Sequence, residues 1–180
     1  DVVNGAFIPA LDVVGKKFDA GEFFLPQLMA SAEAVKAGFD VVREHMGESG
    51  ASIDDGRSIV VATVKGDIHD IGKNIVKMLL ENYGYRVIDL GRDVDPSEIL
   101  RVVREQNVRL VGLSALMTTT VKAMEETIEL LHREVPGCSV FVGGAVLTPE
   151  YAAQIRADHY SKDAADSARY AEEYFASIGL

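Results

Sequence analysis

The sequence predicts an α/β fold, in which five parallel strands form a sheet with helices on both faces. The first observation is residues 59–64, Ile-Val-Val-Ala-Thr-Val, a short, continuous and β-branched run, as expected for a strand that is buried on both faces. The second is the regular alternation of such runs with helical patterns, which builds βαβ units and therefore a parallel sheet. Layers of this kind are typical of flavodoxin-like and Rossmann-like proteins.

The remaining elements follow residues 59–64 in a regular order. Further strands are predicted at residues 85–90, 109–113 and 138–142, with a weaker one at 157–160. The helices between and after them are predicted from apolar side chains spaced three or four residues apart. These side chains are Ile75, Val76, Leu79 and Tyr83; Ile99, Val102 and Val103; Val121, Met124, Ile128, Leu131 and Val135; and Ala164, Ala168, Ala171 and Phe175.

Residues 1–50 are predicted to form a separate helical domain in front of an α/β domain at residues 51–180. A first helix carries apolar side chains at helical spacing as far as Gly21, which breaks the pattern. A second helix begins near Pro26, a residue suited to a first helical turn. Residues 47–57 then contain three glycines and two serines, a composition typical of a linker.

Composition and charge exclude several classes of partner. The formal net charge is -10 and the pI is near 4.8, so no basic stripe can neutralise the phosphates of a nucleic acid or an anionic membrane. The sequence contains no apolar stretch long enough to span a bilayer. The single cysteine, Cys138, cannot form an intrachain disulfide, which favours a reducing compartment. We therefore expect a cytoplasmic protein with neither nucleic acid nor membrane among its partners.

Three predicted loops follow the carboxyl ends of strands, at residues 65–72, 114–120 and 143–148. In open α/β sheets the ligand binds beyond these ends. Each loop carries residues that are unusual for a simple connection. We therefore expect the functional residues to lie in these loops.

The first loop does not match the phosphate-binding motifs. Gly66 and Gly72 have five residues between them, where a Walker loop has four, and Asn74 replaces the hydroxyl residue of that motif. The dinucleotide pattern G-x-G-x-x-G is absent from the sequence, and the acidic residues of the loop would repel a phosphate. These observations argue against a nucleotide as the ligand.

The same loop places a histidine between carboxylates. Asp67 and His69 are two residues apart, so the carboxylate can accept a hydrogen bond from one ring nitrogen and leave the other to bind a metal. A metal site made of protein ligands alone is not expected, because His45, His132 and His159 lie on other segments. His69 is better suited as an axial ligand to a metal that a macrocycle already holds. From the loop alone, a solvated histidine or a helix cap explains His69 equally well.

Three motifs in this order resemble the signature of cobalamin-binding domains, and the intervals between them also fit that family. The motifs are Asp67-x-His69-x-x-Gly72, Ser114-x-Leu116 and Gly143-Gly144. Three elements at compatible spacings are far more specific than any one of them. The resemblance extends over nearly the whole chain.

The N-terminal helices carry a second part of the resemblance. Phe24-Leu25-Pro26-Gln27, followed by Ser31-Ala32, is similar to the helical cap of methionine synthase and of the corrinoid proteins of methyltransferase systems. As a cap, Phe24 and Leu28 would cover the upper face of the corrin, although core packing is an alternative role for them. The sequence before Phe23 has room for only about one helix, fewer than relatives have, which leaves the completeness of the cap open.

The resemblance implies roles for residues of the first two loops. His69 is expected to bind the cobalt of cobalamin in place of the cofactor's own dimethylbenzimidazole base, and Asp67 to hold the other ring nitrogen. Thr120 stands where methionine synthase has a serine that continues this relay. Ser114 and Thr118 are expected to line the pocket for the displaced nucleotide tail. The other loop residues expected to contact the cofactor are Gly66, Ile68, Asp70, Ile71, Gly72 and Leu116.

The third loop and the segment after it are expected to contact the nucleotide tail. Gly143 and Gly144 lack a Cβ and would let the tail pass close to the backbone, and Ala145 follows them. Ala164 occupies a position that contacts the tail in relatives. Each residue also has a purely structural explanation, since two glycines after a strand suit a tight turn.

The resemblance implies a methyl carrier of one-carbon metabolism rather than an enzyme acting alone. Cob(I)alamin would take a methyl group from a donor-specific methyltransferase. Methylcobalamin would then pass it to a second methyltransferase, with tetrahydrofolate or a thiol as the acceptor. A reductive activase is a further expected partner, and a related corrinoid can stand in for cobalamin. The methyl donor, the native corrinoid and the oligomeric state stay open.

Three other functions also stay open. The cobalamin subunit of an adenosylcobalamin-dependent mutase would share the His69 loop, although the Phe24-Leu25-Pro26-Gln27 segment favours methyl transfer. A cobalamin-dependent regulatory or photoreceptor domain is a second alternative, although such proteins usually carry a basic DNA-binding module. The third is a flavodoxin-like binding module that holds no cobalamin.

Overall fold

The computed structural model describes residues 6–45 and 56–180. The chain divides into two units. The first comprises residues 1–53 and 82–84, and the second comprises residues 54–81 and 85–180. The linker predicted at residues 47–57 lies outside the described residues, apart from Gly56 and Arg57.

Residues 6–45 of the first unit contain the helices α1 (Ile8–Asp19) and α2 (Leu25–His45), which pack against each other. A Cβ on Gly38 would lie 2.5 Å from the Phe7 ring, so the glycine allows this aromatic side chain to approach α2 closely. Gly21, with φ of 73°, follows α1 in the left-handed conformation that commonly ends helices. The helical structure predicted for this part of the chain is confirmed.

The second unit is built on a five-stranded sheet with the strand order β2-β1-β3-β4-β5. Its strands are β1 (Ser58–Thr63), β2 (Arg86–Asp89), β3 (Leu110–Ser114), β4 (Ser139–Gly143) and β5 (His159–Tyr160). Every neighbouring pair is parallel. This is the flavodoxin-like order, so the predicted α/β fold is confirmed.

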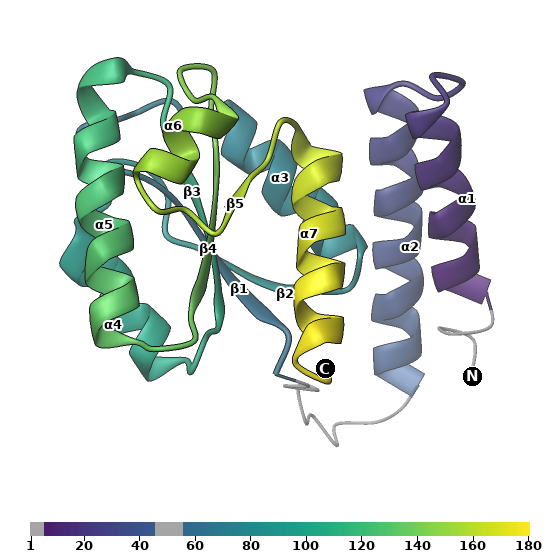
Figure 1. Ribbon diagram of the computed structural model, residues 1–180. Coiled ribbons are helices and arrows are strands. Elements are labelled where there is room, and N and C mark those ends of the chain that lie inside the picture. Colours follow the sequence, from purple (N-terminus) through teal and green to yellow (C-terminus); the bar gives the residue numbers. More distant parts are fainter. Residues whose placement is uncertain (1–5, 46–55) are drawn as a thin grey trace. The chain divides into compact units, whose positions relative to one another are not determined.

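Helices cover both faces of this sheet, with α3 and α7 on one side and α4, α5 and α6 on the other (Figure 1). Their bounds are α3 (Ile71–Asn82), α4 (Pro96–Glu105), α5 (Val121–Glu134), α6 (Pro149–Gln154) and α7 (Ala164–Ser177). Three of them begin at side-chain caps, because Asp95, Thr148 and Asp163 each accept a hydrogen bond from a backbone N–H of the first turn. Within the described residues, no helix combines the length and apolar character that a membrane crossing requires.

Strand alternation divides the core between the two faces. Val60, Val111 and Val140 belong to a cluster that packs under α4 and α5, whereas their neighbours in sequence face α3 and α7. Phe141 is one of these neighbours, and its ring meets Tyr170 of α7 edge to face. The central strands are buried on both faces, which explains why residues 59–64 are apolar apart from Thr63.

The structure departs from the predicted elements at two places. The helix α6 was not predicted, because its six residues are too few for a helical period to show in the sequence. The last strand contains only His159 and Tyr160 instead of residues 157–160. The strand β5 pairs with β4 at two positions only, His159 with Phe141 and Tyr160 with Val142.

Candidate functional site

The three predicted loops meet at the carboxyl edge of the sheet. Backbone hydrogen bonds join them: Val64 donates its N–H to the carbonyl of Ser114 at 3.1 Å, and Ala115 donates to that of Gly143 at 3.2 Å. The strand register also places Ser114 opposite Gly143. Motifs that are far apart in the sequence therefore line one edge.

Asp67 is the centre of this edge, and its side chain is fully buried. Its Oδ1 accepts hydrogen bonds from the backbone N–H of His69 at 3.0 Å and from the ring Nδ1 of His69 at 2.8 Å. Its Oδ2 accepts from the backbone N–H groups of Leu116 and Met117 at 2.7 and 3.2 Å, and from the Thr120 hydroxyl at 2.9 Å. One carboxylate thus connects the first loop to the second.

These contacts keep Asp67 ionised. Burial alone would raise the pKa of this carboxyl, but hydrogen bonds from the backbone N–H groups of His69 and Leu116 outweigh it. The ring of His69 and the hydroxyl of Thr120 lower the pKa further, so that it lies far below the ordinary value. A carboxylate that accepts several N–H groups is stabilised in its charged form.

The Asp67 carboxylate also sets the tautomer of His69. Since a carboxylate can only accept, Nδ1 must carry the proton, and Nε2 of the neutral ring then has a free lone pair. The imidazole is 45% exposed although Asp67 is fully buried, so the ring projects from the loop toward solvent. The loop therefore presents a metal-ligating nitrogen in a defined orientation.

Thr120 extends this arrangement by one more group. Its hydroxyl oxygen lies 2.9 Å from Oδ2 of Asp67 and 2.8 Å from the carbonyl oxygen of Met117. The hydroxyl has a single proton, so the two acceptors compete for it. The residues predicted as a relay, His69, Asp67 and Thr120, form a continuous hydrogen-bonded chain in the structure.

Asp93 holds the first loop and Lys73 holds the helix that follows it, and the sequence analysis did not single out either of them. Asp93 accepts a hydrogen bond from the N–H of Gly66 at 2.8 Å and donates its own N–H to the carbonyl of Asp67 at 2.9 Å. Lys73, whose side chain is 3% exposed, pairs with Asp89 at 2.5 Å. Asp89 is near the end of the strand predicted at residues 85–90, and Asp93 follows that strand, a position at the carboxyl edge that could have marked both.

The two glycines of the third loop differ in how much space a side chain would have at each position. Gly144 has φ of 146°, and a Cβ there would lie 1.8 Å from the carbonyl oxygen of Ala115, so only glycine fits. At Gly143 a Cβ would be 3.4 Å from the carbonyl oxygen of Ser161, an ordinary contact. Ala145 is exposed beyond them, and Ala164 is the half-buried first residue of α7.

Exposed apolar side chains gather in the loops around His69. Ile68 is 61% exposed and Ile71 is 78% exposed, while Leu116 and Met117 are about two-fifths exposed. Large apolar groups left in solvent at the ligand edge of a sheet favour a ligand with an apolar surface. Met117 is the member of this group that the sequence analysis did not name, although it stands between two predicted contact residues.

The remaining predicted residues of these loops are also at this edge. Thr118, in the short turn η2 (Thr118–Thr120), is exposed, and Asp70 is half-buried. Gly66 adopts a left-handed φ of 84° in the turn after β1. A Cβ on Gly72 would meet no atom within 4 Å, so the protein's own packing does not require a glycine there.

The two residues predicted to form the cap lie in the first unit. Phe24 directly precedes α2 and is 65% exposed, whereas Leu28 of α2 is 7% exposed. The exposure of Phe24 suits a contact residue. The burial of Leu28 is more typical of a helix residue that packs in a core.

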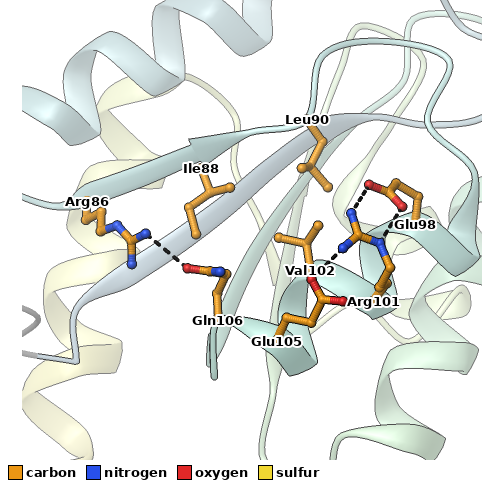
Figure 2. Close-up of a pocket in the computed structure, with 8 residues that line it drawn as sticks. All are labelled: Arg86, Ile88, Leu90, Glu98, Arg101, Val102, Glu105 and Gln106. Atoms are coloured by element: carbon orange, nitrogen blue, oxygen red, sulfur yellow. Dashed lines mark hydrogen bonds and ion pairs between the residues drawn. The ribbon is translucent and has the colours of Figure 1, made fainter.

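A groove elsewhere in the second unit contains none of the predicted residues. It has a volume of about 410 Å³ and lies between β2 and α4, on the edge of the sheet (Figure 2). Its polar side chains bind one another: Arg101 pairs with Glu98 and Glu105, and Arg86 donates to Gln106. The groove therefore offers no set of unpaired polar groups for a ligand.

The residues at the carboxyl edge fit a cobalamin. His69 offers a fixed imidazole nitrogen to a metal that needs one axial ligand, and Ile68, Ile71 and Leu116 offer apolar surface beside it. Gly144 brings two backbone segments into contact where a side chain cannot fit. Among the described residues, no group of three or more histidine, cysteine and acidic side chains forms a metal site of its own.

Comparison with known proteins agrees with this fit. Residues 57–174 match a family model described as a B12 binding domain, and residues 1–43 match a second model with the same description. The chain is 40% identical to dimethylamine corrinoid protein 3 of Methanosarcina mazei, over 92% of this chain and 100% of that protein. It is 36% identical to a corrinoid protein of Desulfitobacterium hafniense, over 96% of this chain and 82% of that protein.

A solved structure gives the same result. The chain resembles the methanol:cobalamin methyltransferase complex from Methanosarcina barkeri, with a TM-score of 0.86 and 34% identity, over 100% of this chain and 68% of the matched chain. Fold, loop residues and relatives thus agree. The chain belongs to the B12-binding corrinoid proteins of methyltransferase systems, and its cofactor is cobalamin or a related corrinoid.

Proposed function

We propose that this corrinoid protein carries a methyl group between two methyltransferases and binds its cofactor base-off, with His69 as the lower axial ligand to cobalt. The observation that carries the proposal is the buried carboxylate of Asp67, which holds Nδ1 of His69 at 2.8 Å and leaves Nε2 for the metal. The relatives support the methyl-carrier function, since their names include dimethylamine and trimethylamine corrinoid proteins.

The protein's own residues would orient the cofactor and move a proton. A bound corrinoid supplies the cobalt that accepts and releases the methyl group. His69 would fix the lower face of the ring. His69 would hold the cobalt through Nε2, and the ionised Asp67 would stabilise positive charge on the imidazole through the hydrogen bond from Nδ1. Thr120 can turn its hydroxyl proton between Asp67 and the carbonyl of Met117 and so adjust that stabilisation.

The nucleotide tail would lie along the other two loops. We propose that Ser114, Thr118 and Ala164 line its path and that Gly143 and Gly144 allow it to pass near the backbone. Residues 1–50 would form the cap domain, with Phe24 against the upper face of the corrin, and residues 51–180 the cobalamin-binding domain. The cap must open for each partner in turn, and the linker at 47–57 is the proposed hinge.

The proposed partners are two methyltransferases and a reductive activase. The first methyltransferase supplies the methyl group, from a methylamine or methanol by analogy with the relatives. The second passes it to tetrahydrofolate or a thiol. Acting alone, the protein is a carrier and not an enzyme.

A methyl-transfer assay tests this function. The corrinoid-loaded, reduced protein is mixed in turn with methyltransferases for monomethylamine, dimethylamine, trimethylamine and methanol, each with its isotope-labelled substrate. We expect one of them to leave label on the protein in proportion to bound corrinoid. Transfer from none of the four, together with tight retention of adenosylcobalamin, would contradict the methyl carrier and favour a mutase subunit.

A further inference from the structure

Three neighbouring strands end in small residues at the carboxyl edge of the sheet, and a fourth small residue directly follows β5. The register places Thr63 of β1 opposite Ser114 of β3, and Ser114 opposite Gly143 of β4. Ser161, directly after β5, continues this row, because it donates its N–H to the carbonyl of Val142 at 2.9 Å. Its own carbonyl oxygen is 3.4 Å from the position of a Cβ on Gly143.

Strand alternation puts this row on the face that α3 and α7 cover. Each residue before a member of the row, such as Leu113 or Val142, packs in the core on the α4 and α5 face. Phe141 and His159, two residues before Gly143 and Ser161, have side chains on the same face as the row, and both contact Tyr170 of α7. The row therefore lies between the sheet and the start of α7. The first turns of α7 contain the small residues Ala164, Ser167 and Ala168, of which the last two are buried.

Ser161 has a polar group that this environment does not satisfy. The residue is 5% exposed, and its hydroxyl oxygen has no hydrogen-bond partner among the described residues. Buried hydroxyl groups usually have a partner, and one without it costs free energy. The hydroxyl of Ser167 does not supply it, since that group donates to the carbonyl of Asp163 at 3.3 Å.

We propose that the Ser161 hydroxyl binds the ribose–phosphate part of the corrinoid's nucleotide tail, and that it helps to select cofactors that carry a tail. The proposal rests on the proposed function, in which His69 displaces the base and the tail must run elsewhere. Strands are about 4.8 Å apart, so Ser161 lies about 14 Å from β1, three strands along the edge. A flat macrocycle above the edge cannot reach a buried oxygen between the sheet and α7, whereas a flexible chain can.

Because Ser161 is proposed to contact the nucleotide tail and not the corrin ring, the proposal can be tested directly. Cobinamide has the same corrin ring as cobalamin but no nucleotide, so the two ligands separate contacts to the ring from contacts to the tail. The dissociation constants of both are measured for the wild type and Ser161→Ala. We expect the variant to bind cobalamin about tenfold more weakly, the effect of one lost hydrogen bond in a buried site, and cobinamide with unchanged affinity.

Ser58 provides a matched control. It is also a buried serine whose hydroxyl has no partner among the described residues, but it lies at the opposite end of the sheet, at the start of β1. Ser58→Ala should leave both dissociation constants unchanged. The melting temperature of the cofactor-free Ser161→Ala protein should equal or exceed that of the wild type, because an unsatisfied polar group is removed. If Ser161→Ala does not fold, Ser161→Cys is used in its place, because the cysteine side chain is similar in size to serine and its thiol forms only weak hydrogen bonds.

The possible outcomes are distinct. Equal cobalamin affinity in wild type and Ser161→Ala overturns the role of Ser161. An equal loss for cobalamin and cobinamide also overturns it, because the residue would then act on the ring or on the fold. A folded wild-type protein that binds neither ligand overturns the proposed function itself.

Discussion

At the scale of the residue, Asp67 determines what the site can do. A single buried carboxylate orients the imidazole of His69, receives two backbone N–H groups of the second loop and meets the hydroxyl of Thr120. The sequence motif predicted the first of these contacts, since Asp67 and His69 are two residues apart. It could not predict the contact of Asp67 with Met117, because that contact depends on the pairing of β1 with β3.

Replacing Asp67 by asparagine tests this arrangement. The amide can still accept from His69, but its NH₂ group would face the N–H donors of Leu116 and Met117. We expect the cofactor-free protein to lose about 3 kcal/mol of unfolding free energy in urea denaturation, because buried donors become unsatisfied. Asp70→Asn is the control. Asp70 flanks His69 on the other side and is not a partner of Asp67, so a change within about 0.5 kcal/mol is expected. Equal effects of the two changes would contradict the central position of Asp67.

Alanine substitutions at the motif glycines can show which glycine is needed for folding and which is needed for cofactor binding. At Gly72 a Cβ would meet nothing within 4 Å, and the residue lies in the first turn of α3. Gly72→Ala should therefore keep or raise the stability of the cofactor-free protein, since alanine favours a helix. If the corrin packs against this turn, the same change weakens cobalamin binding by about tenfold or more. Unchanged binding, measured by equilibrium titration, would remove Gly72 from the contact surface.

Gly144, in contrast to Gly72, is required by the fold itself, so its replacement should lower stability. A Cβ there would lie 1.8 Å from the backbone of Ala115, and the backbone conformation is one that side chains rarely adopt. Gly144→Ala should lower the unfolding free energy of the cofactor-free protein by about 2 kcal/mol or more, in the same urea experiment. A variant as stable as the wild type would show that this loop can move away without cost.

At the scale of the element, the start of α3 is held against β2 by a buried ion pair. Lys73 and Lys77 of α3 both contact Asp89, the last residue of β2, which also accepts the N–H of Gly91. Burial alone would raise the pKa of Asp89, but the hydrogen bonds from Lys73, Gly91 and Lys77 and the charge of Lys73 together outweigh it and hold the pKa below its ordinary value of 3.8. The stabilisation is therefore complete above that ordinary value and is lost as the pH falls through the lowered pKa of the folded protein.

Removal of one partner tests this ion pair. Lys73→Met should cost about 2 kcal/mol of unfolding free energy at neutral pH, because it leaves a largely buried carboxylate with weaker compensation from Lys77. The variant should also lose less additional stability than the wild type on acidification below pH 3.8, measured by urea denaturation at several pH values. Lys122→Met removes an exposed lysine that pairs with Glu126 at 3.9 Å, and it should have almost no effect. A similar pH dependence for both variants would contradict this role of Lys73.

The elements differ in how well the sequence predicts them. The strand at residues 59–64 was recognisable because it is a short, continuous and β-branched run, and α5 because its apolar residues repeat regularly. The short helix α6 was missed, since six residues contain less than two turns. The ion pair of Lys73 with Asp89 was missed because it joins two elements, and a sequence shows neither their distance nor their burial.

At the scale of the molecule, strand order explains why three separated motifs form one site. In the order β2-β1-β3-β4-β5, the three strands that precede the motif loops are adjacent. The loops after β1, β3 and β4 therefore meet at one edge. The sequence predicted this edge from the parallel βαβ pattern alone, and the resemblance to cobalamin-binding domains predicted its ligand. The role of Ser161 could not be predicted, because only the register shows that it continues the row of small residues.

The central claim is that His69 binds cobalt, and electron paramagnetic resonance tests it most directly. The wild-type protein and the His69→Ala variant are reconstituted with hydroxocobalamin, freed of unbound cofactor and reduced to cobalt(II). The wild-type spectrum should show nitrogen splitting that changes when the protein contains ¹⁵N-labelled histidine, and His69→Ala should lack this splitting. A wild-type protein that retains the cofactor but shows a splitting unaffected by the histidine label, or no splitting, would contradict the claim.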